Sequence, residues 1–359
     1  MATAGAAPSS DVIPVRPDER FDEARVAAWL RGRLEGADGP LAVSQFGGGH
    51  ANLTYLLRFG DGPGAREYVL RRPPLGPVAP GSHDMSREHR VLSVLWKAFP
   101  LAPRSYLFCD DPALLGAPFF VMERRYGVVV RGGIPESFGG GRDEAANRKL
   151  SSVVVDVLAD FHAVDPARAE LGDLGRPEGF LARQVTGWTA RWERSKVEGD
   201  PLADELQRWL LDNLPASPPA TLLHNDWRLD NMAVAADDPG RCVAVYDWDM
   251  CTRGDPLCDL GTVLAVWYDP DEVASSLNPM PTTAAGFLRR DEAARRYGER
   301  SGRDLALLPY YLVFGTFKMA VVLQQIYFRY HQGQTKDARF AGMGEGAKAL
   351  FRLAASRRP

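Results

Sequence analysis

The sequence predicts an α+β protein of two lobes, a small lobe built on an antiparallel sheet followed by a larger, mostly helical lobe. Its 359 residues are more than one domain usually holds and are natural for two lobes. Strand-like apolar runs fill the first third of the chain, and helical periodicity dominates the rest. We therefore expect a disordered tail over residues 1–15, an N-terminal lobe over 16–122 and a C-terminal lobe over 123–359.

Short strands separated by turn-forming residues are expected in the first lobe. The segment from Gly60 to Gly64 is rich in glycine and proline, and three consecutive glycines from Gly47 to Gly49 separate two apolar runs. A helical pattern is inserted before the last strand. The expected elements are strands at 41–46, 53–59, 67–71 and 118–123 and a helix from about 85 to 99.

The second lobe is predicted to be helical apart from one hairpin. Apolar residues between Leu150 and Phe161 recur at helical spacing and form a wide stripe that is expected to be buried. The hairpin is indicated by two short strand patterns around a turn that contains Pro239 and Gly240. The expected helical regions are 150–161, 164–220 and 255 onward, and the hairpin strands are 232–235 and 242–246 around a turn at 237–240.

The composition is that of an ordinary globular protein, with 45% hydrophobic and 25% charged residues. A net charge of -3 gives no large cationic field, so we expect no nucleic-acid partner. The four cysteines form no CxxC pair, which favours a reducing cytoplasm over a disulfide framework or a zinc site. Residues 1–10 lack the pattern of a signal peptide, and polar residues interrupt the most apolar segment, 311–328, so a buried helix is expected there and not a membrane span. The oligomeric state is left open.

A polar loop after an apolar pair has the spacing of a phosphotransferase catalytic loop. Residues 224–231 read HNDWRLDN, which matches the kinase pattern H-x-D-x-x-x-x-N. A carboxylate at Asp226 can orient an attacking hydroxyl and accept its proton, and Arg228 can reach toward the γ-phosphate. His224 is interpreted as a hydrogen-bonding strut within the loop. The alternative is an ordinary polar loop before a hairpin.

Asn231 and Asp247 flank the predicted hairpin. An antiparallel register with its turn between them would place these two residues side by side at one strand end. An amide oxygen and a carboxylate are hard oxygen ligands, which suit Mg²⁺ that also holds phosphates. We therefore predict Asn231 and Asp247 as the metal ligands.

A second group of residues, in the first lobe, is suited to hold phosphates. Gly47, Gly48 and Gly49 lie between two strands, where backbone N–H groups can cradle an anion, although a plain hairpin turn has the same pattern. Arg71 on a following strand supplies a permanent positive charge and bidentate donors. Arg72, on the opposite face of that strand, is the alternative.

Glu88 provides an independent test of this phosphate clamp. It lies on the apolar stripe of the helix expected over 85–99, where a charge without a partner would be costly. We therefore expect Glu88 to pair with Arg71. The alternative is that Glu88 lies at the edge of the stripe and reaches water.

Other conspicuous residues are better explained as structural. Asp255 before Pro256 is typical of a helix N-cap followed by the first helical residue. His162, at the end of an amphipathic pattern, is expected to be a core histidine with satisfied hydrogen bonds. Trp188 and Trp192 are one helical turn apart and are expected to pack in the core.

With these motifs, the chain resembles the aminoglycoside phosphotransferase and choline kinase family, which has a protein-kinase-like fold. The resemblance extends from about residue 40 to 340, and it is strongest to the branch found fused to acyl-CoA dehydrogenases. The motifs that carry it are GGGHANLTYLL (47–57), YVLRRPP (68–74), HDMSREHRVL (83–92), PFFVME (118–123), HNDWRLDN (224–231), YDWDM (246–250) and GDPLCDLG (254–261).

The resemblance implies roles for individual residues. Asp226 would be the catalytic base, Asn231 and Asp247 would bind Mg²⁺, and an adenine pocket would lie along Phe120–Glu123. Asp249 stands where the family also carries an acid. Asp259 would brace the catalytic loop. The residues implied to bind ATP are Gly47, Gly48, Gly49, Asn52, Arg71, Glu88 and Glu123.

Two positions depart from the pattern of the family. His50 and Ala51 precede Asn52 where the branch usually has Ser before Asn, which puts γ-phosphate contacts in that loop in question. Asn225 stands where Gly is usual, and its side chain is expected to face outward.

The sequence therefore predicts an ATP- and Mg²⁺-dependent kinase of a small molecule that carries a hydroxyl group. A protein kinase is disfavoured because a helix start at Asp255 follows Asp247 too closely for an activation segment. A catalytically silent nucleotide-binding pseudokinase is disfavoured because the chain retains Asp226, Asn231 and Asp247.

The identity of the acceptor is left open between a hydroxylated acyl compound and an aminoglycoside or choline-type amine. Residues 181–196 carry four basic residues and one acid, a surface that would attract a carboxylate or a CoA phosphate and repel a polycation. The same charges would also suit a solvated helix face, and the wider region 164–220 is net acidic. The basic residues are Arg183, Arg191, Arg194 and Lys196.

Overall fold

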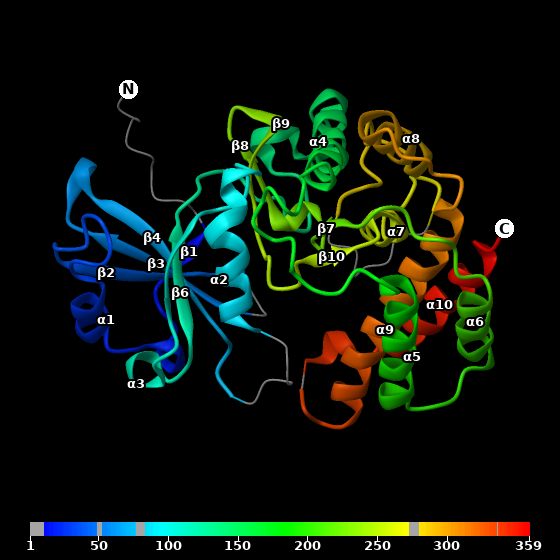
Figure 1. Cartoon of the computed structure of the whole chain (residues 1–359), viewed down its shortest axis with the longest axis horizontal. Coiled ribbons are helices and arrows are strands. Elements are labelled where there is room, and N and C mark those ends of the chain that lie inside the picture. Colours follow the sequence, from blue (N-terminus) through cyan, green and yellow to red (C-terminus); the bar gives the residue numbers. More distant parts are fainter. Residues whose placement is uncertain (1–10, 49–51, 77–82, 273–279, 336) are drawn as a thin grey trace. The chain divides into compact units, whose positions relative to one another are not determined.

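The computed structural model describes residues 11–48, 52–76, 83–272, 280–335 and 337–359. The chain forms two compact units (Figure 1). The first unit comprises the residues up to Tyr126 together with Tyr246–Asp249, and the second comprises Gly127–Val245 and Met250–Pro359. The boundary expected between residues 122 and 123 therefore lies four residues later, and a short segment after the hairpin joins the first unit.

A six-stranded antiparallel sheet is the framework of the first unit. Its strands lie in the order β1-β2-β3-β4-β6-β5, and three helices, α1 to α3, accompany it. The elements are β1 (Val12–Ile13), α1 (Glu23–Leu30), β2 (Leu41–Phe46), β3 (Leu53–Phe59), β4 (Arg66–Arg72), α2 (Met85–Val94), β5 (Ser105–Cys109), α3 (Pro112–Leu115) and β6 (Phe119–Glu123).

The two faces of this sheet have different chemistry because side chains alternate along each strand. On one face, Tyr55, Leu57 and Leu70 pack with Val26 and Leu30 of α1 in a buried apolar cluster. Arg71, the neighbour of Leu70 on β4, points to the other face, where α2 packs against β5 and β6. One face of the sheet thus holds the core, and the other is available for a polar site.

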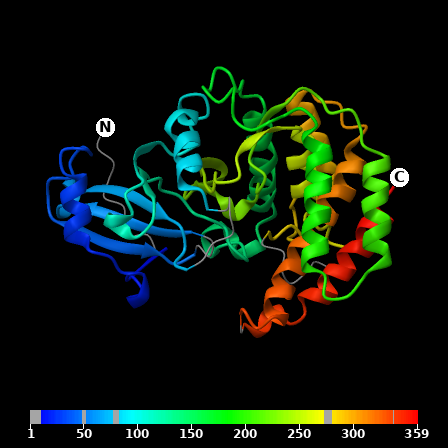
Figure 2. The same cartoon turned by 60° about the horizontal axis from the view of Figure 1, so that its bottom comes forward.

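The second unit is mostly helical. Four of its helices, α5, α6, α9 and α10, pack on one another and lie side by side in Figure 2, while α4 packs against α8. The helices are α4 (Glu144–His162), α5 (Phe180–Ser195), α6 (Pro201–Asp212), α7 (Pro256–Ala265), α8 (Arg290–Ser301), α9 (Leu308–His331) and α10 (Met343–Ser356).

Two short antiparallel strand pairs interrupt these helices. The strand β8 (Met232–Ala235) pairs with β9 (Asp238–Val245), and β7 (Thr221–Leu223) pairs with β10 (Thr252–Gly254). The segment that runs from β7 to β8 is the predicted catalytic loop. Both of its ends are therefore tied into strand pairs.

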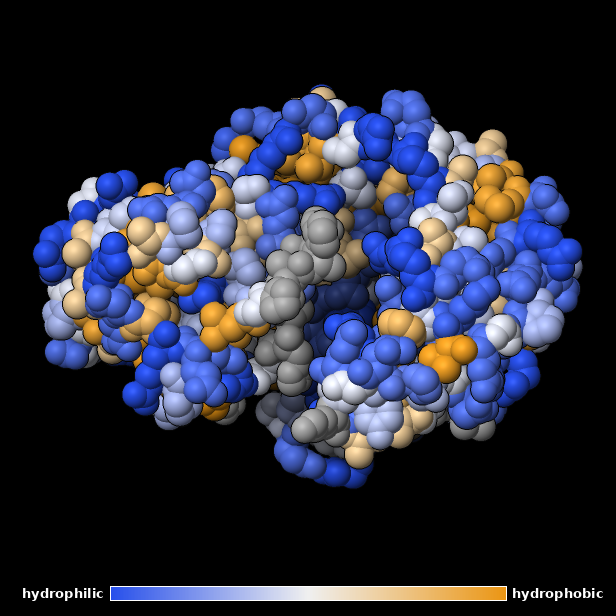
Figure 3. All heavy atoms as spheres, turned by 90° about the horizontal axis from the view of Figure 1, so that it is seen from below, coloured by the Kyte–Doolittle hydropathy of each residue, from blue (hydrophilic) through white to orange (hydrophobic). Residues whose placement is uncertain are grey.

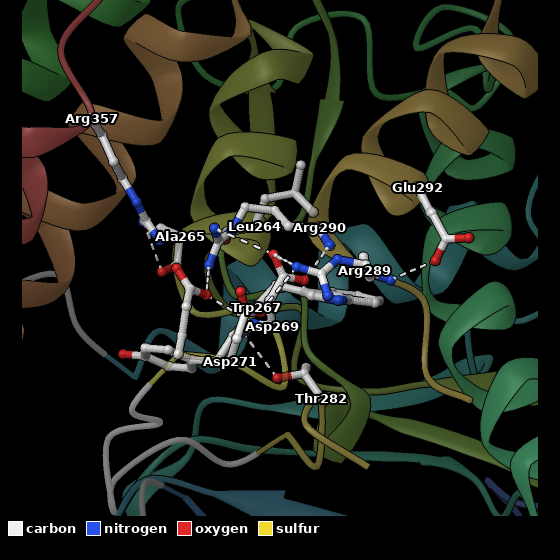
Figure 4. A network of polar contacts seen from close by, with 12 residues as sticks. Leu264, Ala265, Trp267, Asp269, Asp271, Thr282, Arg289, Arg290, Glu292 and Arg357 are labelled. Atoms are coloured by element: carbon white, nitrogen blue, oxygen red, sulfur yellow. Dashed lines mark hydrogen bonds and ion pairs between the residues drawn. The ribbon is translucent and has the colours of Figure 1, made fainter. Parts of the chain in front are cut away.

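A polar network holds the C-terminal end of α7 in place (Figure 4). Arg290, the first residue of α8, donates its backbone N–H to Asp269 at 2.8 Å and its Nε to the Leu264 carbonyl at 3.2 Å. Arg357, just after α10, donates to the carbonyl of Ala265 at 3.1 Å. Two other helices thus satisfy carbonyl groups at the end of α7, where a helix has no partners of its own. The network fixes the helix whose first turn carries Asp259.

Within the described ranges, α9 is the one helix long and apolar enough to cross a membrane, and 61% of its most apolar window is buried in the structure. Core helices pass the same test, and α9 packs against α5, α7 and α10. The face of the molecule in Figure 3 is mostly hydrophilic, and its apolar side chains form small separate groups. The expectation of a buried helix over 311–328 is confirmed.

Several predicted boundaries are wrong. Val12 and Ile13 pair with β2, so the expected tail is ordered in this part, while residues 1–10 lie outside the described residues. The helix expected over 85–99 ends as an α-helix at Val94 and continues as a 3₁₀ turn over Leu95–Lys97. β9 already begins at Asp238, because a shorter turn closes the hairpin and two irregularities absorb the shift in register. The strands at 41–46, 53–59 and 232–235 have the predicted bounds.

Candidate active site

The predicted catalytic loop is held by a buried carboxylate from another helix. Asp259, in the first turn of α7, is 2% exposed. Its Oδ2 accepts the backbone N–H of His224 at 2.7 Å, and its Oδ1 accepts that of Asn225 at 2.9 Å. Burial would raise the pKa of Asp259, but hydrogen bonds from His162 and the backbone of His224 lower it, so the carboxylate stays charged. The role as a brace, which the resemblance implied, is confirmed.

Asp226 is oriented by contacts on both sides. Its backbone N–H donates to Nδ1 of His224 at 3.3 Å, and the His224 side chain is fully buried, as expected of a strut. The Nδ2 of Asn231 donates to the Asp226 carbonyl at 2.8 Å and to its Oδ2 at 2.9 Å. The side chain of Asp226 nevertheless remains 35% exposed. The carboxylate is therefore fixed in direction and still open to a reactant.

Arg228 lies among the acids of its own loop. Its Nε is 3.4 Å from Oδ1 of Asp226 and 3.2 Å from Oδ1 of Asp230. Burial raises the pKa of Asp230, and the charge of Arg228 opposes this. The predicted reach of Arg228 toward a γ-phosphate stays a prediction, since its guanidinium neutralises loop carboxylates in this structure.

The departure from glycine at Asn225 has a conformational explanation. Asn225 adopts φ of 67°, a left-handed conformation in which glycine is unstrained and asparagine is among the best-tolerated other residues. Its Nδ2 donates to the carbonyl of Met250 at 2.9 Å. Asparagine thus keeps the loop geometry and adds one hydrogen bond to the segment that follows the hairpin.

In the first unit, Arg71 is the residue that pairs with Glu88. The Nε of Arg71 is 3.1 Å from Oε2 of Glu88, and the two side chains are 9% and 1% exposed. Arg71 also forms an ion pair with Asp247. Burial by itself would lower the pKa of Arg71, but the carboxylates of Glu88 and Asp247 raise it, so the guanidinium stays charged. The predicted pairing is confirmed.

Arg72 does not take this role. It lies opposite Leu53 in the β3–β4 ladder, and its charge acts on Tyr55, a member of the apolar cluster. Arg72 therefore points to the core face of the sheet, as the alternation of side chains requires.

Glu88 also organises the segment Tyr246–Asp249, which sequence reasoning did not anticipate. Its Oε1 accepts the backbone N–H of Trp248 at 3.3 Å. The Trp248 side chain is fully buried and meets Phe99 edge to face, with ring centroids 6.0 Å apart. Asp247, the residue before Trp248, adopts a left-handed φ of 66°. One buried carboxylate thus positions both the clamp arginine and the predicted metal ligand.

The glycine loop is described in part. Gly47 and Gly48 form a turn directly after β2, and the N–H of Gly47 donates to the Asp11 carbonyl at 3.0 Å. Gly49 lies outside the described residues, as do His50 and Ala51. Asn52 is 5% exposed, and with its amide oxygen facing Arg71 it accepts from Nη2 at 2.7 Å. Asn52 is therefore part of the Arg71 cluster, and a phosphate contact through the Gly47 N–H would require that group to leave Asp11.

Glu123 ends β6 with its carboxylate engaged. Its Oε2 accepts the Arg104 N–H at 3.1 Å and lies 2.9 Å from Nη2 of Arg125. The backbone N–H of Glu123 is engaged as well, since it donates to the Arg104 carbonyl at 2.8 Å, so the adenine contact of this residue stays a prediction. No group of three or more His, Cys, Asp or Glu suited to a metal occurs in the described part of the chain. The roles of Asn231 and Asp247 as metal ligands stay predictions.

The residues expected to be structural are confirmed in that role. Asp255 caps α7 by accepting from the N–H of Leu257 at 3.0 Å. His162 is buried and is 2.7 Å from the hydroxyl of Tyr297. Trp188 and Trp192 are buried as well.

Lys318 is a residue of the site that sequence reasoning missed. From the sequence, Lys318 is only one of the polar residues that interrupt the apolar segment 311–328. Its Nζ donates to the carbonyl of Asn225 at 3.0 Å, directly beside Asp226, and the residue is 8% exposed. A lysine within an otherwise apolar helix was the available signal, because a buried charge needs a partner.

Asp259→Asn should destabilise the protein and slow turnover. An amide presents only one acceptor oxygen to the two N–H groups that Asp259 now accepts, so one buried donor would lose its partner at a cost of about 1–3 kcal/mol. Thermal unfolding and the rate of ADP release measure both effects. Asp212→Asn, at an exposed acid at the end of α6, is the matched control. Parental stability and turnover in Asp259→Asn would contradict the bracing role.

The chain is similar to proteins of known family. A sequence profile of the phosphotransferase enzyme family matches residues 42–305. Acyl-CoA dehydrogenase family member 11 of Homo sapiens is 30% identical over 343 residues, which are 93% of this chain and 42% of that protein. The chain spans about a third to two fifths of the length of the curated relatives it matches.

Solved structures show the same fold. A protein of Ralstonia eutropha, provisionally described as an aminoglycoside phosphotransferase, is 29% identical with a TM-score of 0.78, covering 94% of this chain and 98% of its own. A choline kinase of Cryptosporidium parvum is 11% identical with a TM-score of 0.61, covering 94% of this chain and 95% of its own. The predicted protein-kinase-like fold class is confirmed.

Proposed function

Since the chain belongs to the phosphotransferase enzyme family, as its motifs predicted, we propose that it transfers the γ-phosphoryl group of ATP to a hydroxyl group of a small molecule. The observation that supports this most directly is the braced loop around Asp226. Asp259 holds its backbone, Asn231 holds its carboxylate, and the carboxylate is still 35% exposed. A general base needs this combination of fixed direction and access.

In the proposed reaction, Asp226 orients the acceptor hydroxyl and accepts its proton. The hydroxyl oxygen forms a bond to the γ-phosphorus while the bond to the leaving ADP breaks, which yields a phosphate ester and ADP. Arg228, already beside Asp226 and Asp230, can shift from these carboxylates toward the transferred group. His224 keeps the loop in shape and takes no proton.

Mg²⁺ is the proposed metal ion, with Asn231 and Asp247 as its ligands. The donor set fits, because carboxylate and amide oxygens are preferred by this hard cation. Asn231 uses its amide nitrogen in both of its hydrogen bonds to Asp226, which turns its oxygen away from them. When bound, the ion would neutralise charge on the phosphates during transfer.

ATP is the proposed phosphoryl donor. Arg71 offers a guanidinium that Glu88 holds in place, and such a group matches phosphate oxygens well. Asn52 lies beside it, Gly48 can contribute a backbone donor, and backbone groups near Glu123 would receive the adenine. The nucleotide would compete with Asp247 for Arg71, so a rearrangement of that ion pair is expected on binding.

The proposed acceptor is a hydroxylated acyl compound. The human relative is named as an acyl-CoA dehydrogenase family member, and this chain matches 42% of it. Two of the four basic residues predicted to attract an anion have other partners: Arg183 binds backbone carbonyls, and Lys196 is 2.5 Å from Glu193. Arg191 and Arg194 remain as cations of α5 that can favour an anionic acceptor over an aminoglycoside.

A panel of acceptors tests this function. ADP release would be measured with MgATP and hydroxyacyl-CoAs, hydroxy acids, choline-like amines or aminoglycosides, against the rate without acceptor. We expect the largest increase with an anionic acyl compound, together with a phosphate ester visible by ³¹P NMR. No increase with any acceptor would overturn the kinase proposal, and preferential turnover of kanamycin-like amines would overturn the proposed acceptor class.

Asp247→Ala should weaken binding of the nucleotide in the presence of Mg²⁺. The change removes the predicted carboxylate ligand, so the gain in ATP affinity that Mg²⁺ provides should be largely lost. Calorimetry with ATP, with and without Mg²⁺, measures this gain. Asp237→Ala, in the exposed hairpin turn, is the control. If Asp247→Ala binds MgATP as the parent does, Asp247 is not a main ligand.

A further inference from the structure

Lys318 places a positive charge next to the catalytic loop. It is 8% exposed within α9, and its Nζ donates to the carbonyl of Asn225, the residue before Asp226, at 3.0 Å. This is the only hydrogen bond that Lys318 makes within the described residues, although an ammonium group has three donors. Two donors therefore remain beside the carboxylate proposed as base.

Arg191 brings a second cation to the ring of Trp188, which Lys318 also contacts. Its guanidinium carbon lies 4.3 Å from the ring centre of Trp188, and Nζ of Lys318 lies 5.5 Å from the same ring centre. Trp188 is only 6% exposed, so the indole is a fixed surface for both charges. Such contacts stabilise a cation moderately and leave its N–H groups available to hydrogen-bond acceptors.

In the described part of the chain, these two cations have no carboxylate at ion-pair distance. Neither Lys318 nor Arg191 forms an ion pair within the described residues, and the residues outside them contain no Asp or Glu. The acids that act on Lys318 are Asp259 and Asp226, and their oxygens accept hydrogen bonds within the catalytic loop. Burial lowers the pKa of Lys318, and the charge of Arg191 lowers it further. Two like charges thus share one aromatic ring, and neither has an ion-pair partner among the residues that the structure describes.

We propose that Lys318 and Arg191, which both contact the ring of Trp188, form an anion subsite for the acceptor. The subsite binds the carboxylate or phosphate group of a hydroxylated substrate and thereby positions the hydroxyl at Asp226. A bound oxyanion relieves the repulsion between the two cations and accepts charge-assisted hydrogen bonds from both. This inference rests on the proposed function and specifies its substrate class: acceptors that carry an anionic group as well as a hydroxyl.

A purely structural role explains less of the arrangement. A neutral donor at position 318 would hold the Asn225 carbonyl equally well, without the cost of a buried charge. Arg191 is at an exposed position of α5, where no packing requirement demands a guanidinium over the Trp188 ring. The shared feature of the two residues is a positive charge on the Trp188 ring, which an anionic ligand can use.

Two charge-removing variants test the subsite. Arg191→Gln removes one cation, and Lys318→Gln removes the other while it keeps a donor for the Asn225 carbonyl. The probes are 3-hydroxybutyrate, its neutral amide and its CoA thioester. Each variant should raise the KM for the anionic probe that the parent prefers by about tenfold or more, because a charge-assisted contact is lost. The kcat, the KM for ATP and the KM for the amide should change little. Lys196→Gln, which removes a charge that Glu193 already neutralises, should behave as the parent.

The two anionic probes distinguish the source of the charge. An effect on 3-hydroxybutyrate assigns the subsite to a carboxylate, and an effect on the thioester alone assigns it to the CoA phosphates. The subsite proposal is overturned if the preference of the parent for an anionic probe over the amide is absent, or if it survives in both variants.

Binding measurements separate this inference from the proposed function. Calorimetry would follow each probe with the MgADP-loaded protein, where no turnover occurs. Anion binding that Arg191→Gln abolishes, without ADP release from MgATP for any acceptor, would sustain the subsite and overturn the kinase proposal. Turnover of the acid and the amide with equal efficiency would sustain the kinase proposal and overturn the subsite. Failure of both anionic probes to bind would also overturn the subsite.

Discussion

Asp226→Asn should lower kcat by about 10²-fold or more, the usual contribution of a general base, while the affinity for MgATP changes little. The substitution removes the proton acceptor but keeps a side-chain oxygen for Asn231. In the parent, Nδ2 of Asn231 donates to Oδ2 of Asp226 at 2.9 Å. The loop should therefore keep its conformation, because Asp259 continues to hold its backbone. Steady-state ADP release and nucleotide calorimetry measure the two quantities.

Asp237→Asn is the matched control for this variant. It removes one carboxylate from the turn of the adjoining hairpin, where the side chain is 79% exposed and pairs with Arg241. We expect parental turnover from the control. Near-native turnover of Asp226→Asn on the preferred acceptor would show that Asp226 is not the base.

Glu88→Gln should destabilise the first unit by about 3–5 kcal/mol, the range observed when one partner of a buried ion pair is removed. Glu88 is 1% exposed, and it contacts both Arg71 and the backbone of Trp248. The lower end of the range is favoured because Arg71 keeps its ion pair with Asp247. Urea unfolding followed by tryptophan fluorescence measures the loss, with Trp29, Trp96 and Trp248 as the three of the eight tryptophans that lie in this unit.

Glu35→Gln provides the comparison for an exposed ion pair. Glu35 pairs with Arg66 on β4, the strand that also carries Arg71, but the two side chains are 84% and 60% exposed. Water screens such a pair, so its removal should change stability far less. If Glu88→Gln unfolds at the same urea concentration as Glu35→Gln, the Arg71–Glu88 pair is not a structural element.

Local patterns were sufficient for the elements that position the site. The strands β2 and β3 have the predicted bounds because each is a mainly apolar run that is followed directly by a glycine, Gly47 after β2 and Gly60 after β3. Elements without such patterns were missed. β1 has two residues, too few to show alternation, and it is a strand only because β2 offers it a partner.

The hairpin shows where spacing alone is insufficient. The midpoint between Asn231 and Asp247 falls inside the turn predicted at 237–240, which placed the two residues side by side. In the structure the turn lies nearer to β8, and irregular pairing compensates. A β-bulge changes the count of residues on one strand without a sequence signal as clear as a turn. The prediction that Asn231 and Asp247 share a metal ion is therefore tested by calorimetry of Asp247→Ala with ATP, with and without Mg²⁺.

By itself, the sequence determined the fold class, the HNDWRLDN loop with Asp226, and the pairing of Arg71 with Glu88. These follow from short-range periodicity, from motif spacing, and from the rule that a charge on an apolar stripe needs a partner. Only the tertiary structure decided that Glu88 also binds the Trp248 backbone and that Lys318 reaches Asn225 beside Trp188 and Arg191. Such contacts join residues far apart in the chain, and they depend on how helices and strands pack, which no local pattern records.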